Sequence, residues 1–316
     1  MKQLYKRKGK KLSIRSKIIF HLLVFTVISI IYFKQSDEIA RFKEQLFYYM
    51  KYTRVDNQVD ITEYPPIQHT GDEWYQDARL ISHAGGRIDR SDYSNSKEAL
   101  EETLKKGIYF VEIDFMYTSD QKLVCMHKWE DQWGAENVPS LQEFLSGKIF
   151  GKYTPMTAAN VVEYMENYPE LYVIVDTKEE DQVQVVKTLI DLSAHNPDIT
   201  DRFVIQLYAE GVKSEIQKLY PFQDSNYLFT IYKYGDRMPR SVMKICYDEN
   251  ISVVTIPYSA WKEEDRQIFY SRDFKVYEHT VNCPDDANEA IEEGVWGVYT
   301  DLLSYDDLYL TDENDI

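Results

Sequence analysis

The fold is decided by residues 111–127, which read VEIDFMYTSDQKLVCMH. Residues 109–115 and 122–126 are both apolar runs of the length and composition that buried strands have. The link between them, TSDQ at 118–121, is too short for a parallel crossover, which takes about a dozen residues or more. The two strands are therefore predicted to form an antiparallel hairpin.

The hairpin determines which polar side chains meet. Glu112 and Asp114 are two residues apart on the first strand, so their side chains share one face. A turn near residues 119–121 carries His127, which follows the second strand, back beside both carboxylates. The residues that alternate with the two acids are apolar and suit a face packed under helices. Glu112 and Asp114 are therefore expected to point into the mouth of a barrel.

Strand-like and helix-like segments alternate along the chain from about residue 78. The candidate strands are 79–82, 109–115, 122–126, 171–176, 203–207, 226–230, 252–256, 274–279 and 296–300. The candidate helices are 96–106, 157–168, 181–195, 209–219, 239–249, 261–270 and 285–293. One of the nine strands is the returning arm of the hairpin, so eight parallel strands remain. The chain is predicted to be an α/β protein, a (β/α)8 TIM barrel with a β-hairpin excursion after the second strand. No GxGxxG follows the first strand, which argues against a dinucleotide-binding sheet.

The N-terminus is predicted to be a transmembrane signal anchor. Residues 1–34 hold nine Lys or Arg and no acidic residue. Within them, IIFHLLVFTVISIIYF at 18–33 approaches the length of about 20 apolar residues that a spanning helix needs. Lys17 and Lys34 can extend the span by snorkelling. No small-x-small cleavage site follows, which favours an uncleaved anchor over a signal peptide. Since basic flanks stay inside, we expect a single-pass cell-membrane protein with a cytoplasmic N-terminus and an extracytoplasmic barrel.

Charge and cysteine content narrow the class of protein. Four segments are expected: a basic head at 1–17, the anchor at 18–34, a helix (36–52) and linker within 35–77, and the barrel at 78–316. Residues 53–77 are polar and contain Pro65-Pro66, so they are expected to form a stalk or wrapping segment rather than a core element. The whole chain carries −17, so residues 35–316 carry −26, which argues against a nucleic-acid partner. The three cysteines show no spacing typical of zinc ligands and, being odd in number, no disulfide framework.

Seven motifs together resemble the glycerophosphodiester phosphodiesterase family, one of the phosphatidylinositol-phospholipase-C-like barrels. They follow the family's order and spacing over residues 79–303. They are ISHAGG at 81–86, Asn95 before a helix, VEIDFMYTSDQKLVCMH, YTPMT, VIVDTK, VYEHTVN and GVWGVYTD. Any one of them alone would be a weak signal, whereas the set is specific.

The resemblance implies a role for each residue of the candidate site. His83 and His127 would be the catalytic acid–base pair. Glu112 and Asp114 would bind a divalent metal ion, commonly Ca²⁺ or Mg²⁺, and Asp176 takes the place of the family's third metal carboxylate, which is usually Glu. Four further side chains are candidate substrate contacts, each for a different reason. Lys178 matches a lysine near the phosphate, Asn95 is kept from the family motif, and His279 ends a barrel strand. Trp129 either walls a headgroup or packs internally.

The chemistry of these residue types supports the same assignment. The negative charge of a phosphodiester repels an incoming nucleophile, and a hard cation held by carboxylates offsets that charge. Imidazole suits proton transfer on either side of the phosphorus because its unperturbed pKa of about 6.5 lies near neutrality. The lack of a serine or cysteine motif fits a reaction in which a neighbouring hydroxyl of the substrate attacks.

Departures from the family pattern leave alternatives open. Ala84 stands where the family usually has Arg, the family's Pro-Glu-Asn-Thr is Tyr93-Ser-Asn-Ser96, and Lys128 replaces an Asp. The expected function is metal-dependent hydrolysis of glycerophosphodiesters, or of polymers containing glycerol phosphate, to an alcohol and glycerol phosphate. A catalytically silent phosphodiester-binding or assembly protein is one alternative. A phospholipase C- or D-like enzyme acting on intact lipid is the other.

Overall fold

The structure is a computed structural model that describes residues 56–134, 137–231, 239–258 and 262–310. The predicted basic head, anchor and helix at 36–52 lie outside these residues. No helix among the described residues is both long and apolar enough to span a bilayer. The chain divides into two compact units, Met1–Val55 and Asp56–Ile316, and only the second is described below.

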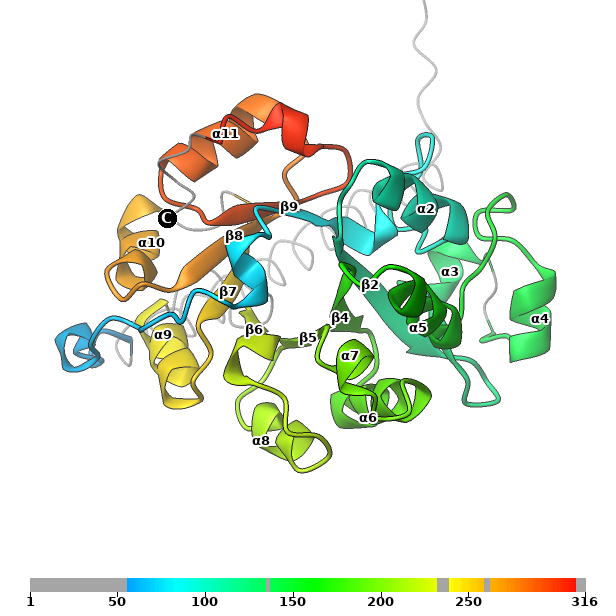
Figure 1. The fold of residues 1–316 in the computed structure, drawn as a ribbon, viewed down its shortest axis with the longest axis horizontal. Coiled ribbons are helices and arrows are strands. Elements are labelled where there is room, and N and C mark those ends of the chain that lie inside the picture. The colour runs from blue at the N-terminus through cyan, green and yellow to red at the C-terminus, as the bar shows by residue number, and fades with distance from the viewer. Residues whose placement is uncertain (1–55, 135–136, 232–238, 259–261, 311–316) are drawn as a thin grey trace, which may run out of the picture. The chain divides into compact units, whose positions relative to one another are not determined.

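Eight parallel strands close into a barrel (Figure 1). The neighbours run in the order β1-β9-β8-β7-β6-β5-β4-β2, and the pairing of Ser82 in β1 with Val111 in β2 closes the ring. The barrel strands are β1 (Leu80–Ser82), β2 (Phe110–Tyr117), β4 (Tyr172–Thr177), β5 (Phe203–Leu207), β6 (Tyr227–Thr230), β7 (Val253–Pro257), β8 (Lys275–His279) and β9 (Gly297–Thr300). The predicted (β/α)8 barrel is confirmed.

The ninth strand, β3 (Leu123–Cys125), is the returning arm of the hairpin. It pairs antiparallel with β2, with Phe115 opposite Cys125. The turn is closed by a hydrogen bond from the Gln121 amide to the Thr118 carbonyl, 2.9 Å. One residue beyond β3, the Met126 amide donates to the Asp114 carbonyl at 2.9 Å, which brings His127 to the level of the acidic pair. The predicted hairpin excursion is confirmed.

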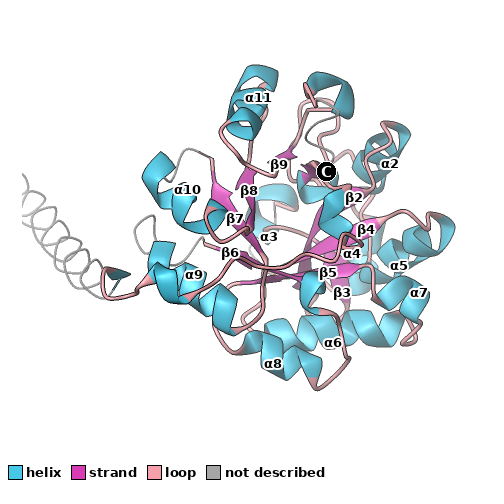
Figure 2. Ribbon diagram, turned by 60° about the vertical axis from the view of Figure 1, so that its left-hand side comes forward, coloured by secondary structure: helices cyan, strands magenta, loops and turns pink. Residues whose placement is uncertain are grey.

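Helices surround the barrel (Figures 1 and 2). Those predicted from the sequence are α2 (Lys97–Lys105), α5 (Ala158–Asn167), α6 (Gln182–Leu192), α8 (Val212–Gln217), α9 (Pro239–Asp248), α10 (Glu263–Tyr270) and α11 (Pro284–Glu292). The Ser96 side chain accepts from the Ala99 amide at the start of α2, and Thr157 forms a capping box with Asn160 at the start of α5. Three short helices are additional: α3 (Trp129–Gln132), α4 (Leu141–Ser146) and α7 (Pro197–Thr200). They are too short to show a helical period in the sequence.

Apolar side chains pack on both faces of the barrel wall. Val111, Ile113 and Phe115 of β2 belong to the core between strands and helices, as the alternation predicts. The barrel interior holds a second apolar cluster, to which every barrel strand contributes one side chain. Those side chains, which we call the apolar plug, are Ile81, Phe110, Ile174, Val204, Leu228, Val253, Tyr277 and Tyr299. The lower part of the barrel is therefore a filled core rather than a pore.

The segment before β1 closes the base of the barrel. Trp74 and Tyr75, in the 3-10 turn η2 (Trp74–Gln76), are buried in the interior cluster, and the Trp74 indole donates to the Ser225 carbonyl at 2.6 Å. The indole ring also stacks on Tyr277, with centroids 6.0 Å apart. Residues 53–77 were expected to wrap the domain or form a stalk without adding to its core. From Asp56 onward they wrap, but for these two aromatic residues the expectation is wrong.

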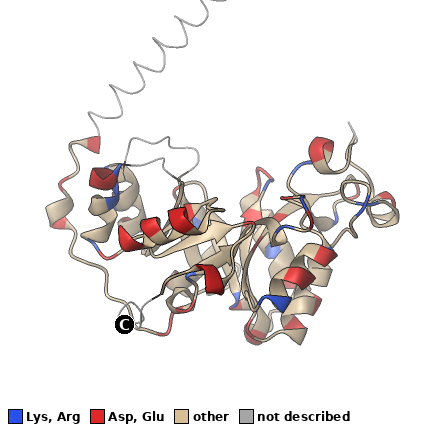
Figure 3. Ribbon diagram, turned by 90° about the horizontal axis from the view of Figure 1, so that it is seen from above, with Lys and Arg blue, Asp and Glu red and all other residues tan. Residues whose placement is uncertain are grey.

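The outer surface carries both signs of charge. Figure 3 shows Asp and Glu spread over many helices and loops, with Lys and Arg interspersed rather than gathered on one face. This pattern matches the acidic composition of the chain after residue 34.

Candidate active site

The candidate site is a polar ring at the carboxyl end of the barrel, directly above the apolar plug. Side chains two residues apart on a strand share a face, so the residue after next in each strand also points inward. Applied to the eight plug residues, this rule gives His83, Glu112, Asp176, Gln206, Thr230, Thr255, His279 and Asp301. The first seven line a small cavity together with Tyr93, His127, Lys178 and Tyr299. The active sites of (β/α)8 enzymes lie at this same end of the barrel.

His83 is held by an aspartate from the last strand. It begins the 3-10 turn η3 (His83–Gly85) directly after β1, and its Nδ1 lies 2.8 Å from Asp301 Oδ1. Burial acts against ionisation of Asp301, yet the hydrogen bond from His83 keeps its pKa below the usual range. An ionised carboxylate only accepts hydrogen bonds, so His83 Nδ1 carries the hydrogen and donates the hydrogen bond to Asp301. His83 Nε2, 3.9 Å from Glu112 Oε2, is left facing the cavity.

Glu112, Asp114 and Asp176 converge as the sequence predicts. All three are buried, and one carboxylate oxygen of each lies within 4.8 Å of the other two. Asp114 and Asp176 are directly paired on adjacent strands β2 and β4. The Lys178 ammonium is 2.8 Å from Asp114 Oδ1 and 2.7 Å from Asp176 Oδ2. One cation thus faces three carboxylates.

The electrostatics of this cluster reflect an excess of negative charge. Burial, followed by the charges of Asp114 and Asp176, raises the pKa of Glu112 well above its usual value. Burial opposes ionisation of Asp114 too, but Lys178 and His127 hold its pKa below the usual range. Lys178 is itself mostly buried, which disfavours its charge, yet the three carboxylates raise its pKa. Buried, hard oxygen donors with more negative than positive charge are the donor set that Ca²⁺ and Mg²⁺ take. The residues present fit such an ion.

Neighbouring groups fix each carboxylate. The Ala84 amide donates to Glu112 Oε2 at 2.6 Å, so Ala84 contributes to the site through its backbone. Asn95 and Asp114 form a reciprocal pair: Nδ2 donates to Oδ2 at 2.7 Å, and the Asp114 amide donates to Oδ1 at 3.1 Å. The Tyr208 hydroxyl, just after β5, donates to Asp176 Oδ1.

His127 reaches the site through the hairpin and is partly buried. Burial is the main cause that lowers its pKa, against the opposing charge of Asp114. His279 also lines the cavity, and burial lowers its pKa to about 3, so it is neutral near pH 7. The lowered pKa of His127 favours its neutral imidazole, the form that accepts a proton.

Two of the predicted substrate contacts lie elsewhere. Asn95 is fully buried behind Asp114, outside the residues that line the cavity. Trp129 packs against Phe144 at 5.7 Å in a satellite cluster under α4, so of the two readings for Trp129 the structure has the packed one. Lys178 and His279 do line the cavity.

Four residues at the site were not predicted as site residues from the sequence: Asp301, Tyr93, Gln206 and Tyr208. Asp301 ends the motif GVWGVYTD, and the two-residue step from an inward-facing tyrosine would have indicated it. Gln206 and Tyr208 follow from the same step on β5, counted from Val204. Tyr93 lies on a loop with no period, so the sequence carries no comparable signal for it.

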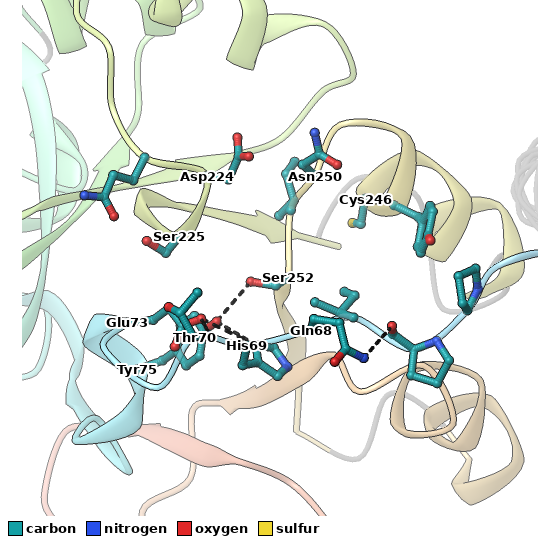
Figure 4. A pocket seen from close by; sticks show the side chains of 16 residues that line it. Gln68, His69, Thr70, Glu73, Tyr75, Asp224, Ser225, Cys246, Asn250 and Ser252 are labelled. Carbon is teal, nitrogen blue, oxygen red and sulfur yellow. Dashed lines mark hydrogen bonds and ion pairs between the residues drawn. The ribbon is translucent and has the colours of Figure 1, made fainter.

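A larger cavity, of about 620 Å³, lies away from this site (Figure 4). One wall is formed within residues 65–75, and the other by residues 223–225 before β6, the end of α9 and residues 250–252 before β7. It is therefore at the amino ends of the strands, opposite the polar ring. Figure 4 shows Glu73 and His69 on the first wall and Asp224 and Asn250 on the second.

No family model and no curated protein matches this sequence. Solved structures do match by fold. A phosphodiesterase of Oleispira antarctica, solved with the product sn-glycerol-3-phosphate, has a TM-score of 0.59 at 16% identity, over 71% of this chain and 92% of its own. Glycerophosphodiester phosphodiesterases of Parabacteroides distasonis (TM-score 0.53, 17% identity, 76% of this chain and 90% of that one) and Thermotoga maritima (0.51, 17%, 71% and 94%) are also similar. At these identities the likeness shows that the chain has the same barrel fold as those enzymes.

Proposed function

We propose that this protein hydrolyses glycerophosphodiesters, or polymers containing glycerol phosphate, to an alcohol and glycerol phosphate. The observation that carries the proposal is one arrangement: a buried cluster of three carboxylates with His83 and His127 at the same cavity. The fold shared with solved phosphodiesterases supports it, as does the description of one of them as a complex with sn-glycerol-3-phosphate.

In the proposed reaction the two imidazoles divide the proton transfers. One takes the proton of the hydroxyl that attacks phosphorus, and the other gives a proton to the oxygen of the departing alcohol as its bond to phosphorus breaks. For His83 the exchanging atom is Nε2, because Nδ1 is bound to Asp301. A neighbouring hydroxyl of glycerol as the nucleophile would give a cyclic phosphate, which water then opens with the two proton transfers reversed.

Glu112, Asp114 and Asp176 would hold the divalent cation, either Ca²⁺ or Mg²⁺. The ion would offset the negative charge on the non-bridging phosphate oxygens. Lys178 adds a positive charge beside the same carboxylates and would contact a phosphate oxygen. The neutral His279 shapes the cavity without adding charge.

The test is release of glycerol phosphate by the full chain with Ca²⁺ or Mg²⁺ present. His83→Ala and His127→Ala should each lower the rate by about 10²- to 10⁴-fold, the usual contribution of a general acid or base. His195→Ala is the matched control, because this imidazole is exposed on the loop after α6, and it should leave the rate unchanged. Full activity of both site variants would refute the proposal.

Product analysis separates the alternatives. Metal-dependent binding of a phosphodiester without turnover would indicate a silent binding protein, a reading suggested by Ala84 and Lys128. Release of diacylglycerol or a cyclic phosphate from intact lipid would indicate a phospholipase instead. Glycerol phosphate and a free alcohol, released from a deacylated diester or from a polymer containing glycerol phosphate, agree with the proposed function.

We further propose that residues 18–34 anchor the chain in the cell membrane with the barrel outside the cytoplasm. Support comes from the apolar run and from the basic residues that precede it. Protease added to intact cells should then remove the barrel while leaving the basic head protected. A barrel that is cleaved only after the cells are lysed would contradict this orientation.

A further inference from the structure

The ring of Tyr93 lies against both histidines. Its centroid is 4.6 Å from that of His83, with the planes at 82°, and 4.7 Å from that of His127, with the planes at 51°. Such separations are those of aromatic rings in direct contact. Tyr93 therefore shares the space in which the two imidazoles would have to reach one phosphorus atom.

The backbone of Tyr93 is held while its side chain reaches solvent. Gln132 of α3 donates from Nε2 to the Tyr93 carbonyl at 3.0 Å and accepts from the Lys128 amide at 2.6 Å. Two residues on, Asn95 is fixed to Asp114. Tyr93 as a whole residue is nevertheless 36% exposed. Rotation about the Cα–Cβ bond can move the ring outward without unfolding the loop.

The cavity beside the ring is too small for a substrate. Its volume is about 40 Å³, whereas sites for small molecules usually measure about 300–1,000 Å³. A phosphate group with two alcohols needs several times the available space. The only wall residue with a ring in contact with both imidazoles that is also exposed is Tyr93, among the residues that the structure describes.

We propose that Tyr93 is the specificity-determining residue of this site. Its ring has to swing toward solvent before a phosphodiester can lie between His83 and His127, and the space that it sweeps limits the bulk of the alcohol. This inference rests on the proposed function. The energy required to move the ring raises the apparent KM, because only the open fraction of the protein binds substrate. The rate of the chemical step after binding, and so kcat, should stay nearly constant, since neither histidine changes.

The kinetic test compares the full-length protein with four variants on glycerophosphoethanolamine and the bulkier glycerophosphoinositol. Tyr93→Asn and Tyr93→Gly remove the ring, and both residue types tolerate the positive φ of 59° at this position. Both should lower KM about tenfold with kcat within about twofold, and the gain should be larger for the inositol diester. Tyr93→Phe keeps the ring and should therefore keep the wild-type preference between the two diesters, whereas Tyr93→Trp should raise KM.

A second readout needs no turnover. Diethyl pyrocarbonate modifies unprotonated imidazoles, and peptide mapping reports the rate at each histidine. His83 and His127 should react about tenfold faster in Tyr93→Asn and Tyr93→Gly than in wild type or Tyr93→Phe. His195, far along the chain and exposed, gives the reference rate that should stay constant in every variant.

The outcomes separate the two proposals. If no form of the protein releases glycerol phosphate, the proposed function fails and the modification rates alone decide the role of Tyr93. If wild type turns over but Tyr93→Asn and Tyr93→Gly match it in KM, selectivity and histidine reactivity, the role of Tyr93 is refuted. The same holds if Tyr93→Phe behaves like Tyr93→Asn, because the ring would then not be the obstacle.

Discussion

On each barrel strand, two successive inward-facing side chains have different roles: the first packs in the core, and the second lies in the polar ring. Ile81 and Tyr299 belong to the apolar plug, and two residues on, the same faces present His83 and Asp301 to the cavity. On every barrel strand the change from apolar to polar takes a single two-residue step, so the polar ring lies on a close-packed floor. Such a floor limits the freedom of the side chains above it. The side-chain hydrogen bond between His83 and Asp301 links the ends of the first and last strands.

Asp301→Asn tests that contact. The variant keeps the shape of the side chain but loses the negative charge that accepts from Nδ1, so the ring of His83 is oriented less firmly. We expect kcat to fall about 10- to 100-fold, as is usual for a group that orients another, with little change in KM. Asp306→Asn, on the exposed turn η5 (Tyr305–Asp307), is the control that should keep full activity. Equal rates for the two variants would contradict the role of Asp301.

Elements at the two ends of the barrel have different tasks. The hairpin formed by β2 and β3 brings His127 to the carboxyl end, while the segment 61–76 closes the amino end with Trp74 and Tyr75. The strands must also approach closely for the ring to close. Where β9 begins, a Cβ on Gly297 would lie 2.6 Å from the Arg79 carbonyl oxygen and 2.8 Å from the Tyr277 ring.

Gly297→Ala should therefore destabilise the barrel. The added methyl meets backbone that cannot give way, and overpacking of this kind costs about 1–3 kcal/mol of unfolding free energy. Gly107→Ala is the useful comparison: its φ is +74° but nothing lies within 4 Å, so it reports backbone strain alone. Chemical denaturation should show a transition at lower denaturant for Gly297→Ala. An unchanged midpoint would mean that β9 is placed differently.

The segment that closes the base makes stability depend on pH. Glu73 accepts from the amides of Thr70 at 2.7 Å and Gly71 at 2.9 Å. Burial opposes its ionisation, yet these hydrogen bonds lower its pKa to about 2 from a usual value of 4.5. Because the pKa is lower in the folded state, the stabilisation is complete above pH 4.5 and is lost as the pH falls toward 2.

Glu73→Gln measures this contribution. At pH 7 the variant should unfold at a lower temperature than wild type, and the difference should shrink below pH 4.5 and vanish near pH 2. Glu63→Gln, on the 3-10 turn η1 (Ile61–Glu63) of the same segment, is a control because its side chain is exposed. A difference that stays constant between pH 7 and 2 would show that Glu73 is not the titrating group.

For the whole molecule, the barrel and the core of the site follow from the sequence because both depend on period and spacing. Alternation of two along strands and the four-residue link at 118–121 predict the eight-stranded ring, the hairpin and the position of His127 beside Glu112 and Asp114. Asp176 follows from the family resemblance and joins the carboxylate cluster that the resemblance implies. Lys178 follows from it too and lines the same cavity. Trp129, Asn95 and Tyr93 could not be placed in the same way, since they lie on loops whose tertiary contacts decide their position.

The segment before β1 illustrates a second limit. Its polar composition and Pro65-Pro66 indicate a linker, and most of it does run along the surface. Two aromatic side chains suffice to add it to the core, because an indole or a phenol buries about 150–250 Å². A periodic pattern of apolar residues predicts burial well, whereas the burial of a single aromatic residue in a polar segment leaves no such pattern.

The central claim is that a divalent cation at Glu112, Asp114 and Asp176 supports diester hydrolysis. It is tested most directly by the rate of glycerol phosphate release as a function of free Ca²⁺ or Mg²⁺, for wild type and Glu112→Gln. We expect the wild-type rate to rise to saturation, to disappear in chelator and to return when the ion is restored. Glu112→Gln should need about 10- to 100-fold more metal for half-saturation. A wild-type rate that is the same in chelator as in saturating metal would contradict the account.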